Sequence, residues 1–328
     1  MLEKNINLKL SVCIVTYNHE KYIAQCIQSI VEQVTDFSFE VIVCDDKSTD
    51  STPKILKYFS EKYVGKVRVI LNEANVGVVE NFRIAHASAT APLIAHVDGD
   101  DYWLPGKLDQ QISLFEKYTD CSAIFTNSLV ISDAGIKIGI FSSGVQEKFD
   151  VNYLIEKGNF LHFSSIIYKA IYRESILASN SDFIDFEIYI KLCSFGSILF
   201  LNKPLAVYRA QSATSVIAKN SIKIRHLYLI ALSHANKYGA TQYSLSEAWT
   251  LFTADVLFHE LKIANIGMCF KWLKEVYSVL EPSDISYILV LSGVPTKLLK
   301  LIFKKSIRKV YRSFKKSGSI TDEVFFPR

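Results

Sequence analysis

Three carboxylates lie within the four residues of segment 98–101, Asp-Gly-Asp-Asp. The segment follows a short apolar run at residues 93–97, which begins after Pro92 and predicts a buried strand. Acids at the end of such a strand lie at the carboxyl edge of a sheet, where open α/β folds bind ligands. Like charges this close repel unless a cation lies between them. The pattern indicates a site for Mg²⁺ or Mn²⁺, which bind carboxylates together with substrate phosphates, and an acidic turn without a ligand is the alternative.

The elements that must position these acids alternate between strands and helices. Apolar, strand-like runs and segments with helical spacing follow one another in this order: strand 10–16, helix 22–33, strand 39–44, a helix that begins near Pro53, strand 66–71, helix 78–88 and strand 93–97. Such alternation predicts an α/β fold with a doubly wound, mostly parallel sheet that helices flank. The first, second and fourth strands each end in polar or acidic residues, so we expect one sheet edge to gather the candidate ligands.

The remaining residues predict further elements and then a change of character. They indicate a helix at 105–118, strands at 123–127 and 164–168, a helix at 185–195 and an extended stretch at 198–208 that Pro204 breaks. Strand signals stop near residue 215, and the pattern is helical from there. We therefore predict one domain at 1–215 and a helical C-terminal region at 216–328.

The composition bounds the class of protein. The chain has 328 residues, of which 49% are hydrophobic and 21% charged, so it can build a core and is not disordered. Six cysteines show no metal-ligand spacing, which indicates free thiols in a reducing cytoplasm. The first ten residues lack the apolar core of a signal peptide, and no run reaches the roughly 18 apolar residues of a membrane span.

A net charge of +4 depends on one segment. Residues 297–316 hold nine Lys and Arg and no acid, so the rest of the chain is negative on balance and does not indicate a nucleic-acid partner. Apolar residues recur there at steps of four and three, which predicts a basic amphipathic helix. Such a helix favours a peripheral position on an anionic membrane, here the inner face of the cell membrane, and a helix packed on the protein is the alternative.

Five motifs together resemble a known family. They are the segments 12–20, 41–50, 75–77, 97–103 and 185–187 with 205–209. In this order they resemble the family 2 glycosyltransferases of GT-A fold, of the bacterial type that builds surface polysaccharides. The resemblance covers about residues 8–210. No motif extends it to the region after residue 215.

The resemblance implies a site for a nucleotide-sugar. Its residues would be Thr16, Tyr17, Asn18, Glu20, Asp45, Asp46, Asn75, Gly77, Asp98 and Gly99. Carboxylates suit this role because they accept hydrogen bonds from ribose hydroxyls and a base N–H, although Asp45 and Asp46 also suit a capping turn. Asp100 together with Asp98 would hold the divalent cation, Mn²⁺ or Mg²⁺. Gly99 would let the backbone approach the nucleotide.

The same resemblance implies a catalytic base and a set of residues near the acceptor. Asp185, which begins a predicted helix, would take the proton from the acceptor hydroxyl. Asp182 and Glu187 are rivals, and an acid at a helix start needs no catalytic role. The residues expected near the acceptor or the loop over the donor are Asp101, Trp103, His162, Tyr208 and Arg209. A packed core aromatic is the alternative for Trp103, and a packed histidine is the alternative for His162.

The combined expectation is an inverting, metal-dependent hexosyltransferase. It would move a sugar from a nucleotide-diphospho-sugar, a UDP-sugar by expectation, to a hydroxyl of a growing, lipid-linked glycan in O-antigen or capsule synthesis. A non-catalytic protein that binds sugar-nucleotides or membranes is one alternative. A nucleotidyltransferase is another, although residues 16–21 lack the glycine-rich basic loop typical of that class.

Overall fold

The structure is a computed structural model that describes residues 8–178, 182–210, 221–279, 290, 292–299 and 323–324. The chain forms two compact units. The first comprises residues 1–149, 160–221 and 322–328, and the second comprises 150–159 and 222–321. The domain boundary predicted at residue 215 lies outside the described residues.

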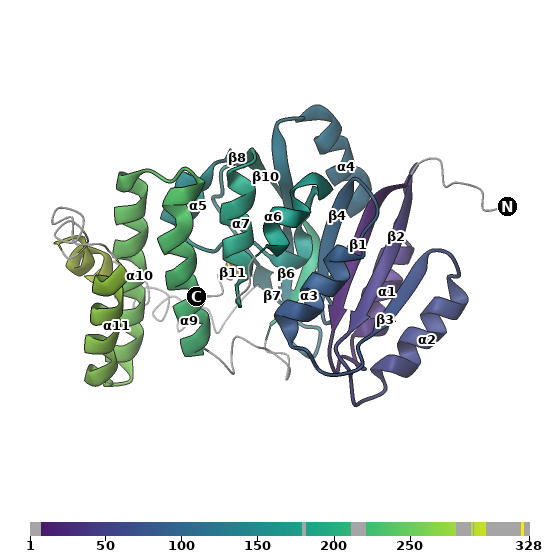
Figure 1. The fold of residues 1–328 in the computed structure, drawn as a ribbon, viewed down its shortest axis with the longest axis horizontal. Helices are drawn as coiled ribbons and strands as arrows, with labels where there is room; N and C mark the ends of the chain where they lie inside the picture. The colour runs from purple at the N-terminus through teal and green to yellow at the C-terminus, as the bar shows by residue number, and fades with distance from the viewer. Residues whose placement is uncertain are drawn as a thin grey trace, which may run out of the picture. The chain divides into compact units, whose positions relative to one another are not determined.

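A mixed sheet forms the centre of the first unit (Figure 1). Its described strands are β1 (Leu8–Thr16), β2 (Ser38–Asp45), β3 (Val67–Leu71), β4 (Leu93–Asp98), β5 (Tyr102–Trp103), β6 (Cys121–Ile131), β7 (Lys137–Ile140), β8 (Lys148–Phe149), β9 (Ile167–Lys169), β10 (Ser197–Arg209) and β11 (Glu323–Val324). The order is β11-β7-β6-β9-β4-β1-β2-β3, and β10 pairs with β5, β6 and β8. Strands β4, β1, β2 and β3 are parallel neighbours, so the carboxyl ends of β1, β2 and β4 meet at one edge.

Helices cover both faces of this sheet. On one side lie α1 (Ile23–Val31), α2 (Thr52–Lys62) and α4 (Lys107–Lys117), which bury apolar side chains in one core with β1 and β2. The buried residues of α1 recur at helical spacing, at Ile23, Cys26, Ile27 and Ile30, which explains why this segment folds as a helix against the sheet. Figure 1 shows α3 (Val78–Ala87), α6 (Arg173–Leu177) and α7 (Asp185–Cys193) on the opposite side.

The mixed α/β fold and the flanking helices confirm the predicted fold class, with three local differences. Residues 197–209 form one strand, which continues through Pro204 with register shifts on both sides of it, because a proline can be accommodated at a bulge. Residues 163–165 form a 3₁₀ turn before β9. β11 adds a short parallel strand beside β7 far downstream of residue 215.

The second unit is helical over its described residues. Its elements are α5 (Val151–Lys157), α9 (Ser221–His234), a 3₁₀ turn (Ala235–Tyr238), α10 (Gln242–Lys262) and α11 (Ile266–Val279). Thr241 caps α10 by accepting a hydrogen bond from the Ser244 N–H. The basic helix predicted at 297–316 lies outside the described residues from residue 300 onward. Among the helices that the structure describes, none is both long and apolar enough to cross a bilayer.

Candidate functional site

The turn at residues 98–101 joins β4 to β5 at the carboxyl edge of the sheet. It closes through the Asp101 N–H, which donates to the Asp98 carbonyl at 3.0 Å, while the Gly99 N–H donates to Val15 at 2.9 Å. A Cβ at Gly99 would lie 2.8 Å from His19 Nδ1 and 2.9 Å from Thr16 Oγ1. Glycine is therefore needed for packing against the protein's own first loop, and the expected approach of the Gly99 backbone to the nucleotide stays a prediction.

Asp98 ends β4 with its side chain 42% exposed. His96 Nε2 lies 3.3 Å from Asp98 Oδ1, because residues two apart on a strand point to the same face. The Asp98 N–H donates to Ser164 Oγ at 3.0 Å. Burial acts to raise the pKa of Asp98, but the hydrogen bond and charge of His96, followed by His162 and His19, outweigh it and hold that pKa below its ordinary value. Asp98 is thus an ionised acid with one side open to solvent.

Asp101, three residues later, is only 3% exposed. Its carboxylate accepts hydrogen bonds from the Ser164 hydroxyl at 2.6 Å and the Arg209 N–H at 3.0 Å, and His162 Nε2 lies 2.8 Å away. His162 also contacts Ser128 through Nδ1 at 2.7 Å. These contacts place Asp101 and His162 in the interior, and a role for either near the acceptor or the loop over the donor stays a prediction.

Trp103 is also an interior residue. It is 2% exposed, donates from Nε1 to the Ser164 carbonyl at 2.7 Å and has the Lys107 ammonium 4.0 Å above its ring. A side chain with so little exposed surface cannot pack on an acceptor. The alternative that the sequence left open, a core aromatic, is the one that the structure shows.

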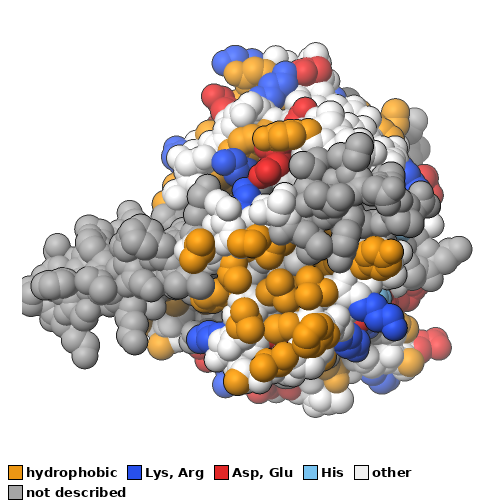
Figure 2. Space-filling model, turned by 90° about the vertical axis from the view of Figure 1, so that its left-hand side faces the viewer, with side chains coloured by type: hydrophobic (Ala, Val, Ile, Leu, Met, Phe, Trp, Pro, Cys, Tyr) orange, Lys and Arg blue, Asp and Glu red, His pale blue; other side chains and the backbone are white. Residues whose placement is uncertain are grey.

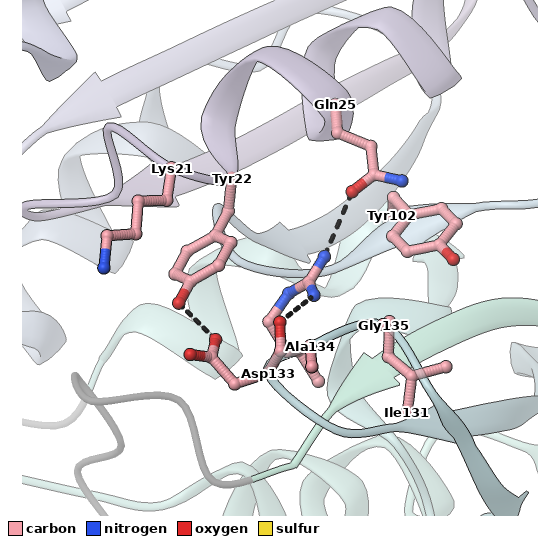
Figure 3. Close-up of a pocket in the computed structure, with 9 residues that line it drawn as sticks. Lys21, Tyr22, Gln25, Tyr102, Ile131, Asp133, Ala134 and Gly135 are labelled. Atoms are coloured by element: carbon pink, nitrogen blue, oxygen red, sulfur yellow. Dashed lines mark hydrogen bonds between the residues drawn. The ribbon is translucent and has the colours of Figure 1, made fainter.

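Arg209 ends β10 and connects the turn to a pocket of about 480 Å³. The pocket is lined by Lys21, Tyr22, Gln25, Tyr102, Ile131, Asp133, Ala134, Gly135 and Arg209. The guanidinium donates to the Asp100 and Asp133 carbonyls and to Gln25 Oε1, at 3.2, 3.4 and 3.0 Å. Figure 3 shows Gln25 and Asp133 at opposite sides of this pocket, with the Asp133 carboxylate directed to the Tyr22 hydroxyl. Neutral oxygens therefore hold Arg209 beside the backbone of Asp100.

Tyr22 and Asp133 belong to the same pocket and were not predicted. The Tyr22 hydroxyl donates to the Asp133 carboxylate (Figure 3). Burial, followed by this hydrogen bond and the charge of Asp133, raises the pKa of Tyr22 to about 12. The Arg209 guanidinium lies 4.7 Å from the centre of the Tyr22 ring, a cation–π contact. No sequence spacing connects these residues, because they come from α1, the β6–β7 hairpin and the end of β10.

The loops after β1 and β2 are joined by hydrogen bonds. The Asn18 N–H donates to Ser48 Oγ at 2.8 Å, and Asn18 Oδ1 accepts from the Thr49 N–H at 2.8 Å. Glu20 accepts from the Ser51 N–H at 2.9 Å, so it belongs to the beginning of α2. Thr16 is 2% exposed, whereas Tyr17 is 41% exposed. Of these predicted nucleotide contacts, Tyr17 has the ring available for a ligand.

Asp45 and Asp46 are buried: Asp45 accepts hydrogen bonds within its own turn, and Asp46 accepts them from the loop that precedes α3. Asp45 accepts from the backbone and hydroxyl of Ser48, and although burial raises the pKa of Asp45, these bonds oppose the shift. Asp46 accepts from the Val76 N–H at 2.7 Å and the Gly77 N–H at 3.0 Å. The role of both acids in nucleotide binding stays a prediction.

The loop that contains Asn75 and Gly77 is shaped around Asp46. Asn75 donates to the Asp46 carbonyl at 3.1 Å. Gly77 precedes α3 with φ of 88°, a backbone conformation that favours glycine, and open space surrounds the position of its missing Cβ. The glycine is therefore needed for the backbone turn, and the loop presents its outer surface at the same sheet edge.

Asp185 is the first residue of α7 and is half-buried. Its carboxylate accepts from the Phe186 N–H at 2.8 Å and from the Tyr189 hydroxyl at 3.0 Å, so it is held in one orientation. Burial, and then the negative charges of Asp101, Asp100, Asp98 and Asp185, raise the pKa of Tyr208. Packing links Asp185 to the 98–101 turn: its partner Tyr189 has its ring centre 5.8 Å from that of Phe163, which stacks on His96 beside Asp98.

The rivals of Asp185 differ in their surroundings. Glu187 is buried and forms an ion pair with Lys191 at 3.1 Å, one helical turn away. This pairing occupies the carboxylate and argues against a role as a base. Asp182 is exposed. Asp185 remains the predicted base.

The acids fit a cation that arrives with its ligand. Within the described residues, no three His, Cys, Asp or Glu side chains converge to form a metal cage. Mg²⁺ nevertheless needs only one or two carboxylates, because waters and substrate phosphates complete its shell. The exposed side of Asp98 and the half-buried Asp100 meet that requirement. The cation itself stays a prediction.

A sheet with acids at its carboxyl edge is typical of the nucleotide-binding α/β proteins. Residues 11–169 match the model of Glycosyl transferase family 2. The putative glycosyltransferase EpsE of Bacillus subtilis is 33% identical over 133 residues, which cover 40% of this chain and 48% of EpsE. Residues 11–169, a little under half of the chain, are therefore similar to glycosyltransferase family 2.

Two further comparisons extend beyond the family motifs. Protein Rv1520 of Mycobacterium tuberculosis is 31% identical over 202 residues, which cover 61% of this chain and 58% of that protein. The match thus spans a little over half of that relative. The crystal structure of Staphylococcus aureus TarS 1–349 in complex with UDP-GlcNAc has a TM-score of 0.60 at 18% identity, and the match covers 96% of this chain and 95% of that one. This likeness shows that the fold is GT-A.

Proposed function

We propose that the chain transfers a sugar from a UDP-sugar to an acceptor hydroxyl, with inversion at the anomeric carbon. The observation that carries this proposal is the position of Asp98, which is ionised and has one side open to solvent, at the carboxyl edge shared by the parallel strands β1, β2 and β4. Binding of UDP-GlcNAc by TarS, which shares the fold, supports the choice of donor.

Each acid has a distinct proposed task. The open oxygen of Asp98 would accept a hydrogen bond from the ribose, and Asp98 with Asp100 would hold Mn²⁺ or Mg²⁺. The bound cation would supply charge neutralisation for the departing diphosphate. Asp185, oriented by Tyr189, would take the proton of the acceptor hydroxyl as that oxygen attacks the sugar.

A direct test measures UDP release with a panel of UDP-sugars and acceptors, with and without Mn²⁺. Asp185→Asn should reduce turnover by about 10²-fold or more, because the amide cannot accept the proton, and should leave the affinity for UDP within about twofold. Asp182→Asn is the matched control and should retain normal turnover. Normal turnover in Asp185→Asn would remove Asp185 as the base. Release of a sugar 1-phosphate instead of UDP would identify the nucleotidyltransferase alternative, and UDP binding without turnover would identify the non-catalytic one.

We further propose that the acceptor is a lipid-linked glycan of O-antigen or capsule synthesis and that the protein is peripheral on the inner face of the cell membrane. Figure 2, which faces α10 and α11, shows hydrophobic side chains gathered in the middle of this face, with Lys and Arg as well as Asp and Glu at its margins. Exposed apolar residues at the α10–α11 turn are Leu261, Ile263, Ile266 and Phe270. This combination of apolar and basic groups suits an anionic bilayer surface.

Sedimentation of the full chain with anionic vesicles tests the membrane proposal. Replacing Ile266 and Phe270 together by Glu should reduce the bound fraction several-fold, because charge then enters the apolar face. Tyr58→Glu, at an exposed aromatic of α2 in the first unit, is the control and should bind as the wild type does. Equal binding of the wild type and the double variant would contradict a membrane role for this face.

A further inference from the structure

A series of hydrogen-bonded, buried polar side chains runs from Tyr168 to Asp98 in the first unit, and we call this series the relay. The Tyr168 hydroxyl lies 2.7 Å from His86 Nδ1, His86 Nε2 lies 3.0 Å from His96 Nδ1, and His96 Nε2 lies 3.3 Å from Asp98 Oδ1. Tyr168 and His96 are 1% exposed and His86 is not exposed at all. The four residues come from β9, α3 and β4, so the sequence places only His96 and Asp98 near each other.

The chemistry of the groups fixes the direction of these hydrogen bonds. An ionised carboxylate accepts only, so His96 Nε2 must donate to Asp98. With one proton on each imidazole, His96 Nδ1 accepts from His86 Nε2, and His86 Nδ1 accepts from the Tyr168 hydroxyl. Burial, with smaller effects of His96 and Arg173, lowers the pKa of His86 well below its ordinary value, so His86 is neutral. In this arrangement, every hydrogen-bond donor of the relay points toward Asp98.

Aromatic packing prevents the two rings from turning away. His96 stacks on Phe163 with ring centres 4.0 Å apart, and His86 stacks on Phe82 at 3.9 Å. Phe82 and His86 are one helical turn apart on α3, which brings both rings to one side of that helix. With their faces packed, each imidazole has its nitrogen-bearing edge left for hydrogen bonding.

Asp98 depends on His96 for its side-chain hydrogen bond. Ser164 Oγ also approaches Asp98 Oδ2, at 3.4 Å, but its single proton is directed to Asp101 Oδ2 at 2.6 Å. One hydroxyl proton cannot serve both carboxylates, and the shorter contact takes it. Among the described residues, His96 is thus the side chain that donates a hydrogen bond to Asp98. Asp98 Oδ2 is left for a ligand.

We propose that His96, oriented by His86 and Tyr168, is a positioning residue that holds Asp98 Oδ1 and thereby turns Asp98 Oδ2 toward the donor nucleotide and its cation. This inference rests on the proposed function for the identity of the ligand. It assigns a role to three residues that contact no substrate. The relay resembles the carboxylate and imidazole partners that orient metal ligands, whose loss typically weakens metal affinity or activity about 10- to 100-fold.

The first experiment measures the proton positions directly. Nitrogen NMR of the full chain with ¹⁵N-labelled histidine should show His86 and His96 each protonated at Nε2 and bare at Nδ1. Spectra of His86→Asn and His96→Asn assign the signals. A bare Nε2 on His96, or a proton on His86 Nδ1, would overturn the relay. This readout needs neither nucleotide nor turnover.

The second experiment compares two variants that both lose the imidazole ring of His96. His96→Gln and His96→Asn both lose the ring that stacks on Phe163, but the Gln amide reaches the position of Nε2 and the Asn amide reaches only that of Nδ1. His96→Asn should raise the Kd for UDP with Mn²⁺ and the donor KM about tenfold, while kcat at saturating donor changes less than threefold. His96→Gln should recover most of this loss. Equal losses in both variants would make His96 a packing residue and overturn the proposal.

Tyr168→Phe tests the far end of the relay without removing a ring. It deletes one hydroxyl, which two residues of the relay, His86 and His96, separate from Asp98. We expect a proton to appear on His86 Nδ1 in part of the molecules and the Kd for UDP to rise about threefold. An unchanged His86 signal together with an unchanged Kd would show that Tyr168 does not orient the relay.

Failure of the proposed function gives a different pattern from failure of the relay. A wild-type protein that binds no nucleoside diphosphate, with or without Mn²⁺, contradicts the proposed function, and the relay is then decided by the NMR experiment alone. Wild-type binding with equal losses in His96→Gln and His96→Asn contradicts the relay and leaves the proposed function intact.

Discussion

Asp98 and Asp101 lie three residues apart in one turn, yet the structure gives them opposite surroundings. Asp101 is 3% exposed and has three partners, from His162, Ser164 and the backbone of Arg209. The Asp98 side chain is 42% exposed and is held on one oxygen by His96. Each acid has a buried histidine behind it, but only Asp98 keeps an oxygen for a ligand.

The difference shows how one short acidic motif divides its tasks. A carboxylate whose lone pairs are met by protein donors in the interior anchors the chain, here by joining β10 and the Ser164 turn to the end of β4. A carboxylate with one oriented oxygen and one open oxygen can bind a ligand at small reorganisation cost. The number of hydrogen-bond donors around each carboxylate, together with its burial, therefore distinguishes Asp101, the anchor, from Asp98, the binding group. Three experiments test that distinction.

The largest expected effect is on stability. Asp101→Ala should lower the free energy of unfolding by about 3 to 5 kcal/mol, because it leaves His162 and the Arg209 N–H buried without their partner. Asp98→Ala should lower it by less, about 1.5 to 3 kcal/mol, because it removes one hydrogen bond between His96 and an ionised carboxylate. Urea denaturation of both variants measures the difference. Similar losses in the two would remove the distinction between anchor and binding group.

The second effect is on nucleotide affinity. Asp98→Asn should weaken binding of UDP with Mn²⁺ by about 1.5 to 3 kcal/mol, or roughly 10- to 100-fold, because a charged hydrogen-bond acceptor is lost. Asp109→Asn, at an exposed acid on α4, is the control and should bind as the wild type does. Titration calorimetry gives both constants. Unchanged affinity in Asp98→Asn would contradict its assignment as the binding acid.

The smallest effect is a pH dependence that His86, which contacts His96 behind Asp98, introduces. His86 has its pKa lowered by burial, so below about pH 6.5 the unfolded chain takes up a proton that the folded chain does not. Stability should therefore fall as the pH falls below 6.5, by about 1.4 kcal/mol per pH unit for this one group. In His86→Phe, the slope of unfolding free energy between pH 6.5 and 5 should be smaller by that amount. An unchanged slope would mean that His86 takes up its proton in the folded state as well.

Much of the first unit followed from local patterns. The strands β1, β2 and β4 were predicted because each is a short apolar run that ends in polar residues, and α1 because its buried positions recur at helical spacing. β10 was predicted as broken at Pro204, but pairing with β6 on both sides carries the strand through it. β11 was missed because a two-residue strand has no periodicity of its own.

The site was predictable only as a set of residue types. The sequence indicated acids at the end of β4 and an acid at the beginning of α7, since both are features of a few consecutive residues. It ranked Trp103 and His162 as candidates near an acceptor, although each is buried by residues from other elements. His96 had one local signal that was not used, because it lies two residues before Asp98 on the same strand and so points to the same face.

The sequence by itself determined the alternation of strands and helices and the edge at which Asp98, Asp100 and Asp101 would meet, because both depend on neighbours in the chain. The tertiary structure decided which of these acids is open, which is enclosed and which histidine orients each one. The physical reason is that burial and hydrogen-bond partners come from distant segments. Asp101 meets His162 from 61 residues away and Arg209 from 108 residues away, and the relay behind Asp98 begins at Tyr168.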